Sequence, residues 1–431
     1  MNLFKTGGTV PFIVLFLLFY APAVNAESIL RAGISVEEGY DSNIYREHEN
    51  EVSEWTTTVS PILDYTRTAR RSLFSLRYVP GFVYSCRTDD TRLDHLAAAE
   101  FGFELTRNLH MDFSDTFVKT EDPYEDPEDI EGGIDLSDRR GRRRYWTNRF
   151  EASAAYTYGM ERVLEMGYRN HVLRDQEEDY FDYVRHSPFA TVSHRINHQW
   201  DVRLEYNTVI GDFAEESEES EDLISNTGDF YLYYRITPFT RIFGHLGYSR
   251  TDYEEGTDDY EVYTAASGVG HNYSPTLDLE FEAGASRVKR KNFSDTSALY
   301  MRAGIDKTWE RTSWYIDGES GLDAHEFSGA EEDLGLSRYW SFATGFSRTL
   351  MRGVEGAVDF SYRHDDYFER EPAEDEQLFE ASAGLSWAFA RWYEVFCRYS
   401  FVGQNADTEE DKYVDHRFFA GISAERDFFR W

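Results

Sequence analysis

Nine short turn-like stretches recur along the chain at intervals of about 40 residues, with one interval of about 50. Midway between successive turns lies a longer stretch that is usually acidic, such as "EESEESED" at 215–222. Short and long connections therefore alternate, so each period holds two extended segments. The turn-like stretches lie at 68–71, 107–110, 159–162, 197–199, 238–240, 274–276, 311–313, 351–353 and 390–392.

The segments between these connections alternate apolar and polar residues. In "LDLEFEAGASR" (277–287), Leu279 and Phe281 would share one face of a strand, whereas Glu280 and Glu282 would share the other. The segments 200–207 and 354–363 repeat this pattern. A helix would scatter these residues around its circumference, so the period of two predicts strands.

Two architectures use strands of this kind. A propeller also repeats about every 40 residues, but it divides that length among four short strands with several turns. Here each period holds two strands of roughly 10 to 15 residues and one tight turn, which favours a transmembrane barrel with short periplasmic turns and long external loops. We therefore predict an all-β, closed, antiparallel transmembrane β-barrel of about 20 strands, within a range of 16–20. Both termini would lie on the periplasmic side.

The two ends of the chain support export and barrel closure. Residues 1–26 combine Lys5, an apolar run too short to span a bilayer, and the small residues Val24 and Ala26, which is typical of a secretory signal peptide. We therefore expect a mature barrel domain at 27–431. The chain finishes on Phe429 and Trp431, which would share one face of a strand, with Phe428 on the other face. An alternating strand that ends in an aromatic residue resembles the signal read by the outer-membrane barrel assembly machinery, and Asp427 departs from its usual apolar alternation.

One face of the predicted strands is rich in charge and would line the lumen. Its carboxylates outnumber its arginines, which favours a modest preference for cations; the alternative is a ladder of cross-strand ion pairs that keeps the wall hydrated. The lumen-lining candidates are Arg77, Glu165, Arg169, Asp201, Arg203, Glu205, Asp278, Glu280, Glu282, Asp317, Glu319, Glu355, Asp359 and Arg363.

Other functional patterns are weak. The basic run "RRGRRRYWTNR" (139–149) would pair with nearby carboxylates or lipopolysaccharide phosphates, or bind an anionic polysaccharide. We find no nucleophile elbow and no calcium-hand pattern, and we expect no enzyme, no catalytic residue, no metal and no cofactor. Cys86 and Cys397 lie in unrelated contexts, and the sequence does not show whether they pair.

Four segments carry a family resemblance. They are "GYDSNIY" (39–45), "RLDH" (92–95), "DTFVKTEDP" (115–123) and "RRRYWTNRF" (142–150). With them the chain resembles the outer-membrane β-barrel porins associated with exopolysaccharide biosynthesis and export loci, some of them in exosortase systems. The resemblance implies a barrel in a transport context and names no substrate.

We therefore expect a porin-like channel in the outer membrane of a Gram-negative cell, supporting exopolysaccharide export. The alternatives are a structural or adhesive barrel that works through its acidic loops and, least favoured, a lipid-modifying enzyme. The expected partners are outer-membrane lipid and lipopolysaccharide, the barrel assembly machinery and polysaccharide export components, with no nucleic acid. The sequence leaves the solute, the oligomeric state and the plugging of the pore open.

Overall fold

The computed structural model describes residues 26–122, 142–175, 182–213, 222–254, 259–290, 295–324, 336–368 and 374–431. Most of the predicted signal peptide therefore lies outside the described residues. So do Arg139, Arg140 and Gly141 of the basic run. The first strand starts at Glu27.

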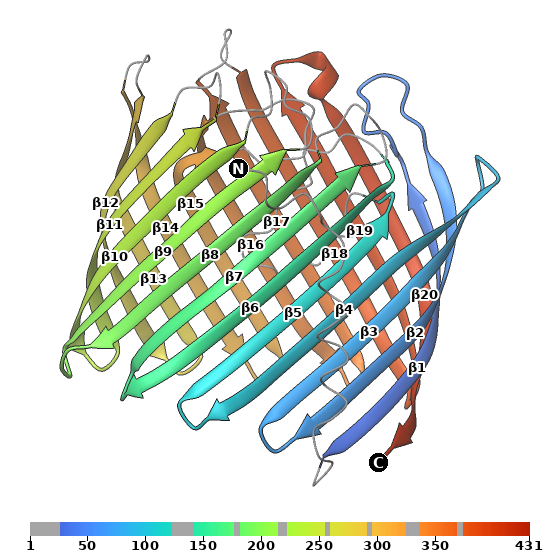
Figure 1. The fold of residues 1–431 in the computed structure, drawn as a ribbon. Coiled ribbons are helices and arrows are strands. Elements are labelled where there is room, and N and C mark those ends of the chain that lie inside the picture. Colours follow the sequence, from blue (N-terminus) through green and yellow to red (C-terminus); the bar gives the residue numbers. More distant parts are fainter. Residues whose placement is uncertain are drawn as a thin grey trace.

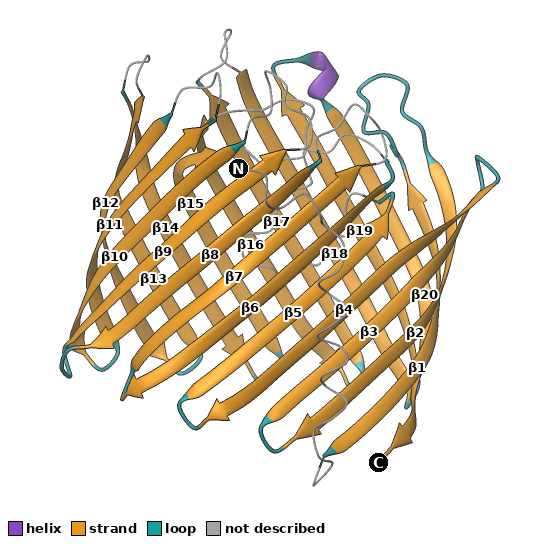
Figure 2. Ribbon diagram, in the orientation of Figure 1, coloured by secondary structure: helices purple, strands orange, loops and turns teal. Residues whose placement is uncertain are grey.

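Twenty antiparallel strands make up one closed sheet (Figures 1 and 2), as predicted from the nine turns. Each neighbouring pair is sequential except the closing pair, β1 with β20. The strands are β1 Glu27–Asp41, β2 Glu54–Ala69, β3 Ser72–Ser85, β4 Asp90–Thr106, β5 Leu109–Thr120, β6 Tyr145–Gly159, β7 Arg162–Asp175, β8 Tyr183–Arg195, β9 Trp200–Phe213, β10 Leu223–Thr237, β11 Thr240–Tyr253, β12 Tyr260–Ser274, β13 Leu277–Arg290, β14 Thr296–Trp309, β15 Thr312–Ala324, β16 Leu336–Met351, β17 Val354–Tyr367, β18 Glu374–Ala390, β19 Tyr393–Ala406 and β20 Tyr413–Arg430.

All nine predicted tight turns join consecutive strands at one end of the barrel, and the longer connections lie at the other end (Figure 1). We call these the tight-turn end and the long-loop end. In the described residues, the one helical element is a 3-10 turn, η3, at Glu409–Asp411. None of the described helical segments has the length and hydropathy needed to cross a membrane.

The last strand closes the barrel at the tight-turn end. The Trp431 N–H donates to the Ser28 carbonyl at 3.0 Å, and the Ser28 N–H donates to the Trp431 carbonyl at 2.8 Å. The Trp431 ring stacks on Tyr65 of β2, with ring centroids 6.3 Å apart. Backbone pairing therefore continues to the final residue, as a barrel without free edges requires.

A register shift in the closing pair changes the predicted faces. Leu30 pairs with Phe429, whereas the next residue, Arg31, pairs with Asp427, so Phe428 is an extra residue in β20. In a strictly alternating strand, Phe428 and Phe429 would point to opposite faces of the sheet, yet both side chains are more than 60% exposed. Asp427, which seemed to break the apolar pattern, forms a 3.2 Å ion pair with Arg31.

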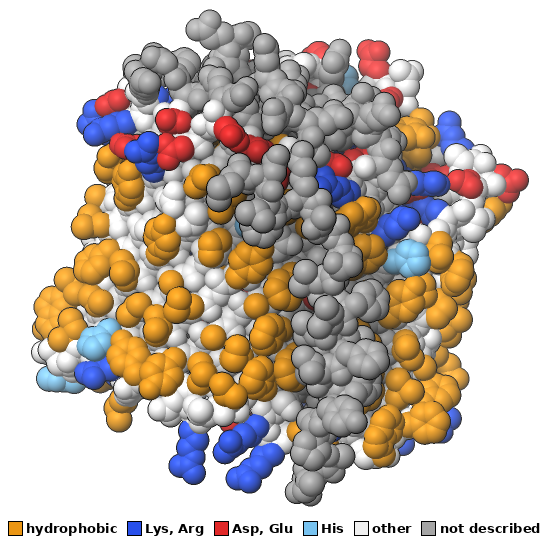
Figure 3. Space-filling model, viewed as in Figure 1, with side chains coloured by type: hydrophobic (Ala, Val, Ile, Leu, Met, Phe, Trp, Pro, Cys, Tyr) orange, Lys and Arg blue, Asp and Glu red, His pale blue; other side chains and the backbone are white. Residues whose placement is uncertain are grey.

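The outer face of the barrel is apolar. Exposed hydrophobic side chains form a broad band on the face that Figure 3 shows, and exposed Trp and Tyr residues lie toward both ends of the strands. A band of this kind with aromatic edges is the lipid-contacting surface of a transmembrane barrel. The aromatic residues toward the long-loop end include Trp55, Tyr84, Tyr206, Tyr248 and Trp340, and those toward the tight-turn end include Trp200, Tyr273, Trp309, Trp387 and Trp431.

Candidate functional site: the lumen and its mouth

The pairing registers place the fourteen lumen-lining candidates on the face opposite the apolar band. On β13, for example, Glu280 and Glu282 alternate with Leu279 and with Phe281, which is 46% exposed on the outside. Residues that are partners across neighbouring strands lie on the same face of the sheet, so Glu282, its partner Arg302 and the next partner, Glu319, all point inward. The inward face is therefore the polar one, as expected for a barrel with a wet interior.

Many of the inward carboxylates have a basic partner. Arg235 lies 2.9 Å from Asp201, Arg302 lies 2.8 Å from Glu319, and Arg203 pairs with Glu205. By contrast, no described cation lies within 4 Å of the carboxylates of Glu165, Asp317 and Glu355, nor of Asp278 and Asp359, which accept hydrogen bonds from Asn272 and Tyr315. The wall is thus a ladder of ion pairs with a remainder of unpaired acids.

Several of the basic partners were missing from the sequence-based set. Arg195 and Arg235 pair with Asp201, and Arg241 pairs with Glu280. The same alternation that selected the carboxylates would have found these arginines if it had been extended along every strand. Neutralising Glu280 would therefore leave Arg241 without its partner.

A row of rings crosses the inner wall from β10 to β14. The His245 imidazole stacks on Tyr231 at 4.2 Å and meets Tyr300 edge-on at 5.7 Å. Two strands, β12 and β13, lie between His245 on β11 and Tyr300 on β14, and in this row they carry only Ala266 and Gly284. The imidazole also lies 2.7 Å from Glu282 and 2.9 Å from Asp229. Sequence reasoning missed this row because it appears only once the registers of five strands are known.

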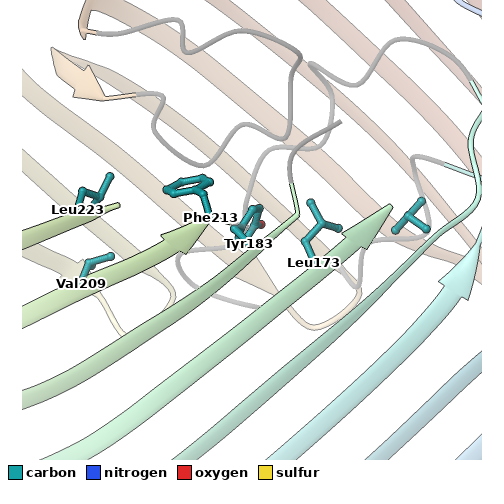
Figure 4. Close-up of a cluster of buried hydrophobic side chains, with 6 residues drawn as sticks. Leu173, Tyr183, Val209, Phe213 and Leu223 are labelled. Atoms are coloured by element: carbon teal, nitrogen blue, oxygen red, sulfur yellow. The ribbon is translucent and has the colours of Figure 1, made fainter. Parts of the chain in front are cut away.

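The inward face becomes apolar and buried at the long-loop end. Here the ends of the strands contribute a ring of side chains that are each 8% exposed or less, and we call it the mouth ring. Five of its members lie together at the upper ends of β7 to β10 (Figure 4). The mouth ring comprises Val83, Val118, Tyr145, Leu173, Tyr183, Val209, Phe213, Leu223, Tyr260, Val288, Tyr367, Val402 and Tyr413.

Below the mouth ring the inward side chains are more exposed. Arg77, Asp278, Asp317 and Glu355 are all classed as exposed although they point into the barrel. The lumen is therefore open toward the tight-turn end and packed at the long-loop end. The 20-strand circumference explains the open part, since facing side chains cannot fill a barrel of this width.

The four segments that carry the family resemblance meet at this packed mouth. The Arg142 N–H donates to the Ile44 carbonyl at 2.9 Å, and its guanidinium pairs with Glu54 and lies 3.6 Å from Asp41. Arg417 of β20 lies 3.1 Å from Asp41 and 2.8 Å from Asp122. These buried ion pairs, which we call the mouth network, join the ends of β1, β2 and β20 to the segments at 122 and 142.

The same network continues along the rim. Thr120 donates to Asp94 at 3.1 Å, Arg92 lies 3.6 Å from Glu121, and Arg144 lies 2.5 Å from Glu121. The Glu121 carboxylate raises the pKa of the Arg144 guanidinium. Within the described part of the basic run, Arg142 and Arg144 thus pair with nearby carboxylates, which was one of the two interpretations of that run.

Asn43 holds the loop after β1 against β20. Its N–H donates to Asp41 at 2.9 Å, and its side-chain amide donates to the carbonyls of Glu47 at 2.8 Å and Val414 at 3.2 Å. The fully buried Asn43 amide therefore anchors this loop. In the connection between β19 and β20, Lys412 lowers the pKa of the Glu409 carboxyl. This carboxyl lies 3.2 Å from His48 of the loop after β1.

Within the described ranges, no three His, Cys, Asp or Glu side chains are arranged to hold a metal ion. Cys86 and Cys397 are both free, which answers the question that the sequence left open. Cys86 follows β3 at the long-loop end and is exposed, whereas Cys397 lies on the outer face of β19.

No protein-family model matches the chain, and no curated protein matches it. A mutant of the ferric enterobactin receptor PfeA from Pseudomonas aeruginosa matches with a TM-score of 0.53 at 7% identity, over 92% of this chain and 80% of that chain. A PfeA mutant in complex with enterobactin gives 0.51 at 8% identity, over 92% and 81%. OccK2 (OpdF) from the same organism gives 0.43 at 12% identity, over 92% and 98%. The likeness to PfeA is one of fold, so the chain has the fold of an outer-membrane β-barrel.

Proposed function

We propose that this protein is a channel of the Gram-negative outer membrane whose extracellular mouth is closed in the resting state. The long-loop end would then be extracellular and the tight-turn end periplasmic, the orientation of outer-membrane barrels in general. The predicted signal peptide at 1–26 would supply export, and Phe429 with Trp431 would present the chain to the assembly machinery.

The observation that carries the proposal is the division of the inward face into two zones. An open, charged lumen reaches up from the periplasmic end, and it ends at the buried mouth ring and the mouth network. The charged wall of this lumen suits the passage of hydrated polar solutes, which favours a channel over a purely structural barrel. A permanently open porin, in turn, would leave the mouth ring exposed to water at a cost of about 25 cal/mol for each Å² of apolar surface.

We further propose a saccharide chain as the solute class, following the resemblance to porins of exopolysaccharide export loci. Tyr231 and Tyr300, which are both partly exposed on the inner wall, support this, because aromatic faces stack on the C–H faces of sugars. The partly exposed Asp229 carboxylate beside the row would accept hydrogen bonds from sugar hydroxyls. Polysaccharide export components would be the partners that open the mouth.

Planar-bilayer recording of the refolded mature chain tests the proposal. We expect rare, brief openings from the unmodified protein and long-lived channels from Arg417→Gln, which leaves Asp41, Asp122 and Asp415 without their shared guanidinium. Arg302→Gln serves as the control, because it breaks one ion pair in the lumen wall and leaves the mouth intact. Silence from all three proteins would favour the structural or adhesive barrel instead.

A further inference from the structure

Basic side chains gather at the tight-turn end, although the chain as a whole carries a formal net charge of -36. Lys and Arg side chains project from the lower edge of the apolar band, and acidic side chains lie above its upper edge (Figure 3). Of the nine tight turns, five carry arginine between the ends of the two strands that they join. These arginines are Arg70, Arg71, Arg107, Arg311, Arg352 and Arg391, and we call them the arginine rim.

The arginine rim is exposed and has no acidic partner. Every member is classed as exposed, and none has a described Asp or Glu oxygen within 4 Å. The acid of a neighbouring turn, Glu161, is engaged by Arg195 and Arg235. Two arginines on the outer face toward the long-loop end do have partners, since Arg250 pairs with Asp252 and Arg338 with Asp366. The guanidinium groups of the rim are therefore available to an external anion.

Neighbouring side chains fix the depth of the rim. Leu105, Trp309, Met351 and Phe389 lie on the outer face within two residues of a rim arginine, and they are between 43% and 62% exposed. Side chains of this kind are stable where they contact hydrocarbon, so the apolar part of the membrane must reach almost to the turns. One or two residues further along the chain, the arginines lie in the adjoining headgroup layer, where phosphate groups are concentrated.

We propose that the arginine rim binds the phosphate groups of anionic phospholipids in the periplasmic leaflet. This inference rests on the proposed membrane location of the barrel. Guanidinium groups suit phosphate because they donate two parallel hydrogen bonds to it. An acidic partner protein is the less suitable ligand, because it would need a continuous basic surface facing the periplasm. These arginines are instead spread around the lipid-facing edge of the barrel, next to apolar side chains.

Lipid retention tests the proposal. The mature chain is refolded in nanodiscs of phosphatidylethanolamine and phosphatidylglycerol, extracted gently, and weighed by native mass spectrometry to count bound lipids. The test variant changes Arg70, Arg107, Arg311, Arg352 and Arg391 to Gln. The charge-matched control changes Arg87, Arg250, Arg287, Lys289 and Arg338, at the other end of the barrel, to Gln.

We expect the unmodified protein and the control to retain phosphatidylglycerol selectively. The test variant should lose at least about tenfold in that selectivity, since one basic residue near an anionic surface contributes about fivefold. Arg311→Gln alone should lose a smaller part, which keeps the test valid if the five-residue variant folds poorly. Equal retention by the test variant and the control would overturn the proposal. Conductance plays no part in this measurement, so a silent barrel that selects phosphatidylglycerol would contradict the proposed channel and leave the arginine rim standing.

Discussion

Replacing Phe281 with Arg should destabilise the barrel in lipid, because Phe281 lies on the outer face of β13 near the middle of the membrane. It follows Thr276 of the tight turn by five residues. A strand tilted by about 40° climbs roughly 2.5 Å per residue along the membrane normal, which places Phe281 about 13 Å above the turn. Half of an apolar band about 25 Å tall is close to this depth, and Arg at the midplane costs about 2–4 kcal/mol.

Urea unfolding of the refolded chain in lipid vesicles measures this cost. Glu280→Gln is the matched control, since Glu280 adjoins Phe281 on the inward face and loses only a partly exposed ion pair with Arg241, worth about 1 kcal/mol or less. We expect the free energy of unfolding to fall substantially for Phe281→Arg and little for Glu280→Gln. Equal losses, or a larger loss for Glu280→Gln, would show that the two faces are assigned wrongly.

Three further predictions concern closure, the mouth and selectivity. Deleting residues 429–431 removes the pairing between Trp431 and Ser28, so the heat-modifiable barrel should disappear from outer-membrane fractions. Arg417→Gln should lower the free energy of unfolding by about 3–5 kcal/mol, because it removes the buried guanidinium that Asp41, Asp122 and Asp415 share. Changing Glu165, Asp317 and Glu355 together to Gln should reduce cation preference in reversal potentials of the opened channel, and the effect should exceed that of changing Glu280 and Glu282, whose partners Arg241 and His245 already offset them.

The sequence predicted the barrel and its two faces because both follow from local patterns. Nine tight turns gave the number of strands, and the period of two sorted Phe281 from Glu280 without any knowledge of neighbouring strands. Register between strands is a different kind of information. The stacking of His245 between Tyr231 and Tyr300 depends on the alignment of five strands, which no local pattern specifies.

The mouth could not be predicted for the same reason. Asp41 and Arg417 lie at opposite ends of the sequence, and they meet only because β1 pairs with β20. Val118 and Leu173 are buried apolar residues on the inward face, where the alternating pattern predicts polar residues. Nothing in the sequence therefore indicated that they belong to the mouth. The register shift at Phe428 likewise made Asp427 look misplaced, although it faces Arg31 across the closing pair.

Cysteine labelling from one side of the membrane tests most directly whether the lumen is open to the periplasm and closed to the outside. Asp317→Cys places a thiol on the exposed inner wall of β15, in a chain whose Cys397 is replaced by Ala. The exposed Cys86 at the long-loop end is kept in a parallel sample as the positive control and replaced by Ser in the test sample. A membrane-impermeant maleimide added to whole cells should label Cys86 and leave the thiol at position 317 unmodified, and permeabilising the outer membrane should make position 317 react. Rapid labelling of position 317 in intact cells would contradict the account.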